Sequence, residues 1–382
     1  MRIIKDFIKK ICWYLFRIFK IDNRKVVVDC FNGRGYFDNP KLIISEMVKL
    51  DKTLKIVCMV SYTQYDKILL PDYIKKVKLN SLEAIYEQVT SKLWIGNSRK
   101  CYFTSKRKGQ IYVQTWHGGI GIKKCERDVV HTLSDSYINF AKKDAAITDY
   151  MIAGSKWQKD LFERAFWYSN KYIELGWPVF DKFLKQGINK SIDIKYRKTF
   201  NISQDKKVLL YCPTFRDDGD LECYDLNFES IIDVLNKKDG LKWVVLIKLH
   251  PNMVDKKDYF QYSENVIEAS TIGDIDELEI FADAMITDYS STMFDFSIMR
   301  KPCYLYVNDY EHYMKERDFN LSLEDLPFPS ARTHQELYDI ILNFDKADYS
   351  TKIDKYLNGL GLLNNPNSSQ DIAKFILERM GE

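Results

Sequence analysis

The chain alternates short apolar runs with stretches of helical periodicity, and this alternation constrains its fold more than any other feature. In the first half, apolar runs at residues 26–30 and 56–60 flank a helical pattern at 40–50. In the second half, apolar runs recur at 208–212 and 243–247. Neighbouring parallel strands need a long crossover, usually a helix, so this pattern is typical of parallel sheets with helices on both faces. We therefore predict an α/β chain with two Rossmann-like domains.

A length of 382 residues accommodates two such domains, and 46% hydrophobic residues are enough for large cores. We predict an interfacial helix at 1–22, a first Rossmann-like domain at 23–180, a linker at 181–206, a second Rossmann-like domain at 207–350 and a helical tail at 351–382. The eight cysteines include no Cys-x-x-Cys pair. We therefore expect buried free thiols in a reducing cytoplasm and no disulfide framework.

The N-terminal segment concentrates the positive charge of the chain. Eight Lys/Arg and two Asp give residues 1–25 a net charge of +6, so the overall +3 leaves −3 for the rest. Apolar residues recur at helical spacing over residues 3–19, and the longest apolar run, 11–16, is far shorter than the ~20 residues that cross a bilayer. No small-residue cleavage site follows, so we expect no signal peptide.

Basic amphipathic helices of this kind lie in the headgroup plane of anionic membranes. We predict such contact through residues 1–20, and the alternative is a terminal helix that packs on the protein's own core. Because the rest of the chain is slightly acidic, we expect no nucleic-acid partner.

Polar residues follow several of the predicted strands, at the sheet edge where open α/β folds bind their ligands. They are His117, Gly118 and Gly119 in the first domain, and Thr214, Arg216, His250, Asp288, Ser290 and Ser291 in the second. Two domains facing each other would line a cleft with these side chains.

This set of side chains suits a phosphate-bearing substrate. Arg216 can pair with phosphate oxygens bidentately, and a helix that starts at Ser290 or Ser291 and runs to Met299 offers free N–H groups to an anion. The alternative is structural, with a capped helix start and packed strand-end histidines. No P-loop, no Gly-x-Gly-x-x-Gly after the first strand and no metal-ligand spacing is present. We therefore expect no required cofactor and no metal.

A series of motifs over residues 110–330 resembles the CDP-glycerol glycerophosphotransferase family, which contains teichoic acid primases and polymerases and related capsule polyol-phosphate transferases. The motifs are Gln-Thr-Trp-His-Gly at 114–118, Lys123 with Lys124, Ile-Ala-Gly-Ser-Lys at 152–156, Glu-Arg-Ala-Phe at 163–166, Tyr-Cys-Pro-Thr-Phe-Arg-Asp-Asp at 211–218, Leu-His-Pro at 249–251, Ile-Thr-Asp-Tyr-Ser-Ser at 286–291, Glu-Arg-Asp-Phe at 316–319 and Glu-Asp-Leu-Pro at 324–327.

The resemblance implies a GT-B-like fold with an acceptor-side first domain, a donor-nucleotide second domain and a monotopic N-terminal helix at the cytoplasmic face of the cell membrane. It implies transfer of glycerol phosphate from the donor substrate CDP-glycerol to a hydroxyl of a lipid-linked glycan acceptor, with release of CMP. The roles that it implies are a general base for His117, donor-phosphate contact for His250, Ser290 and Ser291 with Thr214 and Arg216 nearby, and acceptor-side positions for Gly118, Gly119 and Lys123. We expect Asp288 to organise its loop.

Two segments depart from the family pattern. The chain reads Gly-Ile-Gly-Ile before Lys123, where many members have a Thr-Pro-Leu type sequence, and Trp-Pro at 177–178, where an Arg-Asn pair is common. CDP-ribitol and nucleotide-sugar donors stay open, as does a catalytically silent, membrane-peripheral nucleotide- or glycan-binding protein. The sequence also leaves open primase against polymerase action and a homo-oligomeric state.

Overall fold

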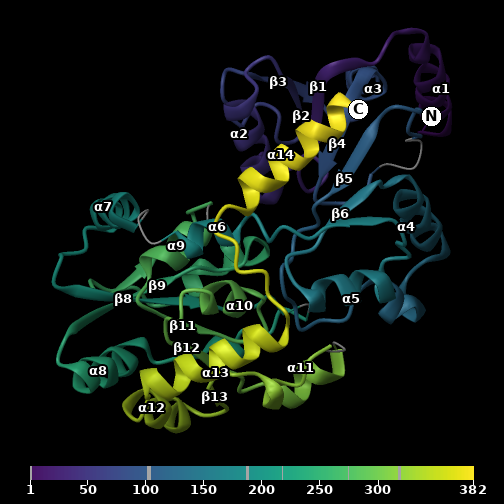
Figure 1. Ribbon diagram of the computed structural model, residues 1–382. Coiled ribbons are helices and arrows are strands. Elements are labelled where there is room, and N and C mark those ends of the chain that lie inside the picture. The colour runs from purple at the N-terminus through teal and green to yellow at the C-terminus, as the bar shows by residue number, and fades with distance from the viewer. Residues whose placement is uncertain (1, 101–104, 186–188, 217, 274, 317–319) are drawn as a thin grey trace. The chain divides into compact units, whose positions relative to one another are not determined.

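The computed structural model of the protein describes residues 2–100, 105–185, 189–216, 218–273, 275–316 and 320–382 (Figure 1). These residues form two compact units, each built around one parallel sheet, so the predicted α/β class is confirmed. Unit 1 comprises Met1–Gly119, Cys125–Asp181 and Gly361–Glu382, and unit 2 comprises Ile120–Lys124 and Lys182–Leu360. Cys101, Asp217 of the 211–218 motif and residues 317–319 of the 316–319 motif lie outside the described residues.

The sheet of unit 1 has the strand order β3-β2-β1-β4-β5-β6-β7, and its neighbouring strands are parallel. Its strands are β1 (Asp22–Asp29), β2 (Lys55–Val60), β3 (Ile74–Lys78), β4 (Ser91–Gly96), β5 (Ile111–Gln114), β6 (Tyr150–Ile152) and β7 (Lys171–Ile173). The helices are α1 (Arg2–Leu15), α2 (Asp38–Leu50), α3 (Leu82–Thr90), α4 (Asp135–Ile147), α5 (Lys156–Ala165) and α14 (Ser368–Gly381), and α6 (Phe180–Leu184) contains the boundary with unit 2.

Strand β1 is buried on both faces, which explains why an uninterrupted apolar run marks it in the sequence. Val26, Val27 and Val28 have no exposed surface. Val27 belongs to a core cluster with Ile85 and Val89 of α3. Val26 and Val28 point to the opposite face, because successive side chains of a strand alternate. Burial of each valine contributes about 1.5–3 kcal/mol.

Helix α1 lies beside α3 and packs on unit 1 through one of its faces. Trp13 has no exposed surface, and its Nε1 donates to the Ser105 carbonyl at 2.9 Å while its ring meets Trp94 edge-on. Other large apolar side chains at this end of the chain are exposed, namely Phe7, Ile8, Ile11, Tyr14, Leu15, Ile18 and Phe19. The segment therefore both packs on the core and presents apolar surface to solvent. None of the helices in the described part of the chain combines the length and apolar content needed to cross a bilayer.

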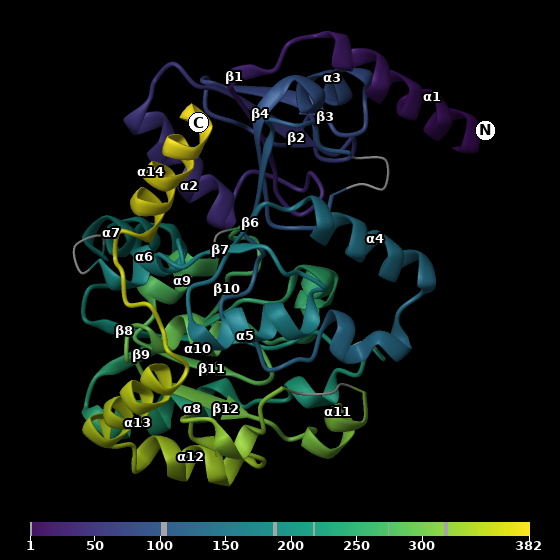
Figure 2. The same ribbon diagram turned by 45° about the vertical axis from the view of Figure 1, so that its right-hand side comes forward.

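The last helix, α14, returns to unit 1 and lies alongside α2 (Figure 2). The Asp181 carboxylate accepts the N–H groups of Ser368 and Ser369, each at 2.9 Å, at the start of α14. Gly176 supports the same contact, because its φ is +106° and a Cβ there would lie 2.1 Å from Ser368 Oγ. The prediction of a separate tail over residues 351–382 differs from this structure, in which residues 361–382 complete unit 1.

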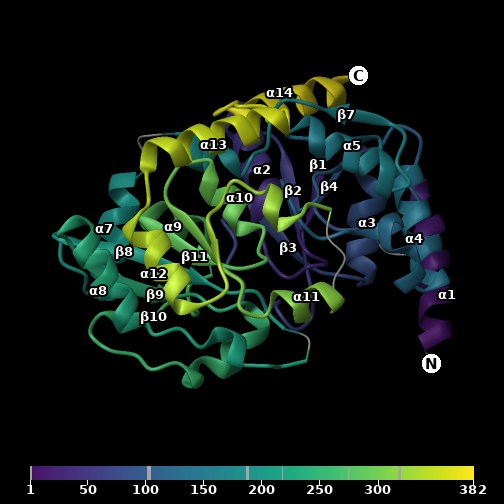
Figure 3. The ribbon, with the colours of Figure 1, turned by 90° about the horizontal axis from the view of Figure 1, so that it is seen from below.

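The sheet of unit 2 has the order β10-β9-β8-β11-β12-β13 and is also parallel. Its strands are β8 (Lys206–Cys212), β9 (Lys242–Ile247), β10 (Val266–Glu268), β11 (Ala284–Thr287), β12 (Cys303–Tyr306) and β13 (Ser330–Ala331). Its helices are α7 (Asn189–Phe200), α8 (Phe228–Asp239), α9 (Ile275–Phe281), α10 (Thr292–Ser297), α11 (Tyr310–Glu316), α12 (His334–Leu342) and α13 (Lys346–Gly359). Helices α8 and α12 pack side by side (Figure 3).

The segment predicted as a linker, residues 181–206, contributes helix α7 to unit 2. Helix α7 packs against α9, and the Tyr196 hydroxyl donates to Glu277 at 2.8 Å. Tyr196 is itself buried. The polar composition of the segment reflects the solvent-facing side of a packed helix, and the buried tyrosine fixes its other side.

Candidate active site

The first group of functional residues lies at the point in unit 1 where the strand order reverses, between β1 and β4, and at the adjacent strand β5. Such switch points are where open α/β sheets bind ligands, because the loops after the two strands diverge there. The three loops here begin after Asp29, Gly96 and Gln114 and carry Phe31, Asn97 and His117 respectively.

His117 is held by its neighbours in one orientation. Its Nδ1 lies 2.6 Å from the Asn97 carbonyl oxygen. Because a carbonyl only accepts, Nδ1 carries the proton and donates it, which leaves Nε2 with a free lone pair in the neutral ring. The ring of Trp116 stacks on the imidazole at 4.4 Å between centroids, and the ring of Phe31 contacts it at 4.8 Å.

His117 is an exposed residue, yet the rings of Trp116 and Phe31 and the Asn97 carbonyl crowd and partly bury its imidazole. This burial lowers the pKa of His117 below its ordinary value, and the Asn97 carbonyl and Glu126 offset only part of the effect. The imidazole is therefore neutral near neutral pH, with Nε2 available as a proton acceptor.

Two unusual backbone positions set this geometry. Phe31 and Trp116 have φ of +47° and +55°, a region that side chains other than glycine rarely adopt. The Asn97 side chain compensates at Phe31 by accepting its N–H at 2.8 Å. Gln114 does the same at Trp116, accepting its N–H at 3.0 Å. Strained residues that the surroundings hold in place are a feature of functional sites.

Of the two glycines after His117, Gly119 has a structural reason to be a glycine, whereas a Cβ on Gly118 would meet no atom within 4 Å. A Cβ on Gly119 would lie 2.8 Å from the Phe180 ring and 3.2 Å from Trp177 Nε1. The Gly118 carbonyl accepts from Gln158 Nε2 at 2.7 Å. Trp177, which stands where many family members have a polar pair, is buried against Gly119 and Gly154. This departure from the family pattern therefore serves packing.

The second group lies in unit 2, again where the strand order reverses, between β8 and β11. Asp288, just after β11, bridges the two loops, because its Oδ1 accepts the N–H groups of Thr214 at 2.8 Å and of Tyr289 at 2.7 Å. Its Oδ2 accepts from Arg216 Nη2 at 2.8 Å. Asp288 is 4% exposed and thus has the geometry of a loop-organising acceptor.

The guanidinium of Arg216 is enclosed by acidic and aromatic side chains. Its Nε and Nη2 donate to Asp309 at 2.6 and 3.2 Å, and its Nη1 donates to the Thr214 carbonyl at 2.6 Å. The rings of Tyr313 and Tyr289 lie 4.7 and 5.1 Å from the guanidinium carbon. Burial alone would lower the pKa of Arg216, but Asp288 and Asp309 outweigh it and raise that pKa.

This arrangement differs from the prediction that Arg216 pairs with phosphate oxygens. The side chain is 4% exposed, and the edge formed by Nε and Nη2 is occupied by the Asp309 carboxylate. A bidentate phosphate contact needs such an edge free. The physical reason is the position of Asp309, three residues after β12, beside Asp288.

His250 lies beyond β9 with one nitrogen occupied. Its Nδ1 accepts the Asn252 N–H at 3.2 Å, so in the neutral ring Nε2 carries the proton and can donate. Burial lowers the pKa of His250, and Lys123 and Lys248 lower it further. Both lysines therefore place positive charge near this imidazole.

The Asp288–Ser291 corner differs in detail from the predicted capped helix. Helix α10 spans six residues, and its N-cap residue Ser291 makes no side-chain capping bond. The Ser290 Oγ accepts from Thr292 Oγ1 at 3.0 Å, and Ser291 is exposed. Thr214 follows β8, the strand next to β11. Its Oγ1 is buried and has no hydrogen-bond partner in the described structure. Of Ser290, Ser291 and Thr214, Ser291 is the exposed one, so its hydroxyl is the most accessible to a ligand.

Lys123 lies in unit 2, although it was predicted on the acceptor side with His117. Its ammonium lies 5.5 Å from the Tyr313 ring centroid, and its carbonyl accepts from Asn320 Nδ2 at 2.8 Å. The Ile122 carbonyl accepts the Asn320 N–H. The short segment that follows His117 in sequence thus anchors in the other unit.

Four residues of these groups were not singled out from the sequence, namely Phe31, Asn97, Asp309 and Tyr313, and Trp116 was noted only as part of the motif at 114–118. Asn97 and Asp309 both follow strands closely, so the rule that found His117 would also have found them. Phe31, Trp116 and Tyr313 act through ring contacts that only the folded chain shows. The described residues hold no group of three or more His, Cys, Asp or Glu placed to bind a metal, and their cysteines are free.

The arrangement can be compared with known proteins. The family model for CDP-glycerol:poly(glycerophosphate) glycerophosphotransferase matches residues 11–378. The chain belongs to this family. A teichoic acid poly(glycerol phosphate) polymerase from Staphylococcus epidermidis is 32% identical over 372 residues, which cover 94% of this chain and 51% of that protein. A teichoic acid glycerol-phosphate transferase from Staphylococcus aureus is 29% identical over 356 residues, or 90% of each chain.

The solved structure of the wall teichoic acid polymerase TagF matches this glycerophosphotransferase family member with a TM-score of 0.84. The sequence identity is 27%, and the match covers 98% of this chain and 94% of that chain. The structure of a TagF variant soaked with CDPG matches the chain with a TM-score of 0.82. The chain spans about half the length of the Staphylococcus epidermidis relative. These comparisons place the chain in a family of enzymes.

Proposed function

We propose that the chain transfers glycerol phosphate from CDP-glycerol to a hydroxyl of a lipid-linked acceptor and releases CMP. The acceptor oxygen would attack the β-phosphorus, the bond from that phosphorus to the bridging oxygen would break, and CMP would leave with the electron pair. The two groups of residues would serve one donor and one acceptor in a GT-B-like arrangement. Membership of the glycerophosphotransferase family supports the reaction.

The observation that carries the proposal is the state of His117. Its Nδ1–H is committed to the Asn97 carbonyl and its pKa is lowered, so Nε2 of the neutral ring can take the proton of the acceptor hydroxyl. The lysine-rich surroundings of His250 suit a different role. We propose that His250 Nε2 donates to a donor phosphate oxygen as charge develops there.

The remaining residues of unit 2 would hold the donor phosphates. Ser290, Ser291 and Thr214 offer hydroxyls, and Lys123 adds a positive charge beside His250. We assign Arg216 a positioning role, because it fixes Asp288 and thereby the Thr214 loop. Phosphoryl transfer depends mainly on such positioning and on electrostatic stabilisation of the phosphate oxygens.

We further propose that the enzyme rests on the cytoplasmic face of the membrane through α1. The support is the exposed apolar surface of α1 and of the residues after it, where Phe7 is 63% and Ile18 is 81% exposed, together with the net charge of +6 over residues 1–25. An apolar face flanked by Lys and Arg binds anionic lipid without crossing the bilayer.

The function is tested by CMP release with a lipid-linked acceptor and a panel of donors. CDP-glycerol is expected to give CMP and an extended acceptor, while CDP-ribitol and nucleotide sugars give little. Faster turnover with CDP-ribitol would change the donor and keep the chemistry. Donor binding without any CMP release would support the catalytically silent alternative.

A further inference from the structure

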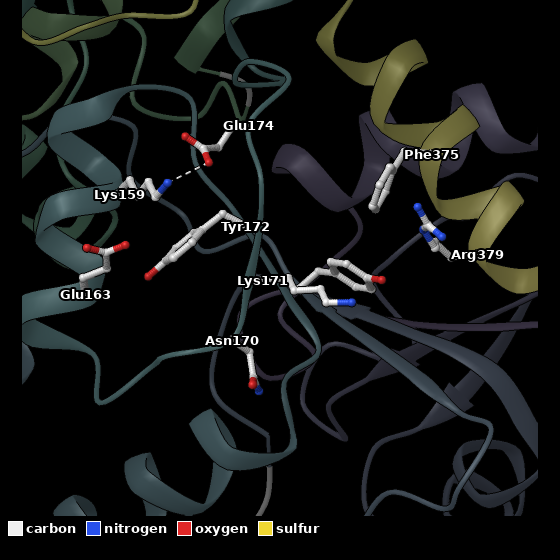
Figure 4. A pocket seen from close by; sticks show the side chains of 9 residues that line it. Lys159, Glu163, Asn170, Lys171, Tyr172, Glu174, Phe375 and Arg379 are labelled. Carbon is white, nitrogen blue, oxygen red and sulfur yellow. Dashed lines mark hydrogen bonds and ion pairs between the residues drawn. The ribbon is translucent and has the colours of Figure 1, made fainter.

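Unit 1 has a pocket that the transfer reaction does not use (Figure 4). Its volume is about 550 Å³, and it lies between α5, the edge strand β7 and α14. Figure 4 shows Tyr172 and Glu163 on one side and Phe375 and Arg379 on the other. Lys171 extends from the middle toward the side of Arg379. Lys159 lies on the side of Tyr172, and Arg379 pairs with Glu382, which is outside the lining, so cationic side chains line both sides of the pocket.

Two buried polar atoms in this pocket have no hydrogen-bond partner in the described structure. They are the Tyr172 hydroxyl and Arg379 Nε. Leaving a buried polar group unsatisfied is unfavourable, so such atoms are rare and call for a functional or structural reason. Arg379 Nε is a hydrogen-bond donor, and the Tyr172 hydroxyl can both donate and accept. A ligand with phosphate oxygens and hydroxyl groups would satisfy both.

Aromatic rings provide the rest of the lining. Phe375 meets Tyr150 edge-on at 5.3 Å between centroids, and Arg379 lies over the Phe375 ring at 5.1 Å. On the other side, Lys159 lies over the Tyr172 ring and pairs with Glu174 at 2.8 Å. Rings of this kind can contact the CH groups of a polyol, and the carboxylates can accept hydrogen bonds from its hydroxyl groups. The combination of cations, carboxylates and aromatic rings suits a polyol phosphate.

The pocket and His117 lie at different levels along the strands of the unit 1 sheet. Tyr150 and Lys171 are paired in register, and Tyr150 is level with Val113 of β5. Tyr150 and Lys171 are the first residues of β6 and β7, whereas His117 lies in the loop beyond the carboxyl end of β5. The His117 loop is not part of the pocket lining, so a ligand that occupies both places has to be longer than the group that reacts at His117.

We propose that this pocket binds an already formed stretch of polyol phosphate chain, with phosphate at Lys171 and Arg379 and polyol hydroxyls at Tyr172 and Glu163. This inference rests on the proposed function, since it takes the product chain as its ligand. The pocket then retains a growing acceptor between transfers without touching the reacting atoms.

The test is calorimetric titration of the full chain with glycerol phosphate oligomers of defined length, without donor. Lys171→Glu replaces attraction by repulsion, and we expect about a tenfold or greater loss of affinity for long oligomers. Tyr172→Phe keeps the ring and removes only the unsatisfied hydroxyl, so it should weaken binding while the melting temperature stays equal or rises. Lys374→Glu, on the same helix as Arg379 but outside the pocket, is the matched control and should bind as wild type.

The proposal is overturned if wild type binds long oligomers no better than single units, or if Lys171→Glu binds as tightly as Lys374→Glu. Initial CMP release with a one-unit acceptor should be unchanged in Lys171→Glu, while its products become shorter. Initial CMP release and oligomer binding together separate the two proposals. A variant that loses oligomer binding but releases CMP normally is affected only in the pocket. Absence of CMP release in wild type concerns the transfer reaction instead.

Discussion

Replacement of Arg216 by glutamine tests whether this residue is a structural partner of two carboxylates or a phosphate ligand. The side chains of Arg216, Asp288 and Asp309 are 4%, 5% and 15% exposed, so the substitution leaves two largely buried carboxylates without their cation. Removing one partner of a buried ion pair costs about 3–5 kcal/mol. For a unit of this size that corresponds to a fall in melting temperature of roughly 6–20 °C, at ~2–4 °C per kcal/mol.

The assay is thermal unfolding of the purified chain without donor, followed by near-ultraviolet circular dichroism. Arg332→Gln is the control, because Arg332 makes an exposed pair with Glu311 in the same unit and such pairs add little stability. Adding Asp309→Asn to Arg216→Gln should recover part of the loss, since one stranded charge is then removed. A melting temperature within about 2 °C of wild type, with a raised KM for donor, would refute the reasoning and make Arg216 a phosphate ligand.

Three further predictions concern unit 1. Phe31→Leu exposes the His117 ring, so the pKa of His117 rises toward its ordinary value and the acid limb of kcat/KM against pH moves to higher pH; an unmoved limb would contradict this. Gly119→Ala places a Cβ 2.8 Å from an aromatic ring and should destabilise the chain by about 1–3 kcal/mol in urea unfolding, whereas Gly118→Ala, with no atom within 4 Å, should not. Ile11→Glu should reduce co-sedimentation with anionic vesicles and leave the melting temperature unchanged, and equal sedimentation would argue against α1 as the membrane contact.

The sequence located the strand-end residues well because strand and helix periodicities are local. His117, Thr214, His250 and Asp288 each follow an apolar run directly, so the sheet edge on which they lie could be read from the chain. Asp309 also follows a strand, but its contact with Arg216 depends on β12 lying next to β11 in the sheet. The order of the strands in the sheet is a property of the folded chain. Without it, the Arg216 side chain looks free to bind phosphate.

The parts that could not be predicted depend on contacts between distant residues. Asp181 receives the N–H groups of Ser368 and Ser369, which lie more than 180 residues away. No local pattern encodes this contact, so the return of α14 to unit 1 was missed. The placement of Lys123 in unit 2 is similar, because Asn320 holds the segment there. In both cases side-chain hydrogen bonds to backbone groups decide the topology.

His117 is the base in the proposed glycerol phosphate transfer, and one measurement tests this role directly. CMP release from CDP-glycerol in the presence of a lipid-linked acceptor is compared for wild type, His117→Ala and His131→Ala, the last being an exposed histidine outside both groups of functional residues. Loss of general base catalysis should slow His117→Ala by about 10²–10⁴-fold, while His131→Ala keeps the wild-type rate. Equal rates in all three proteins would contradict the account.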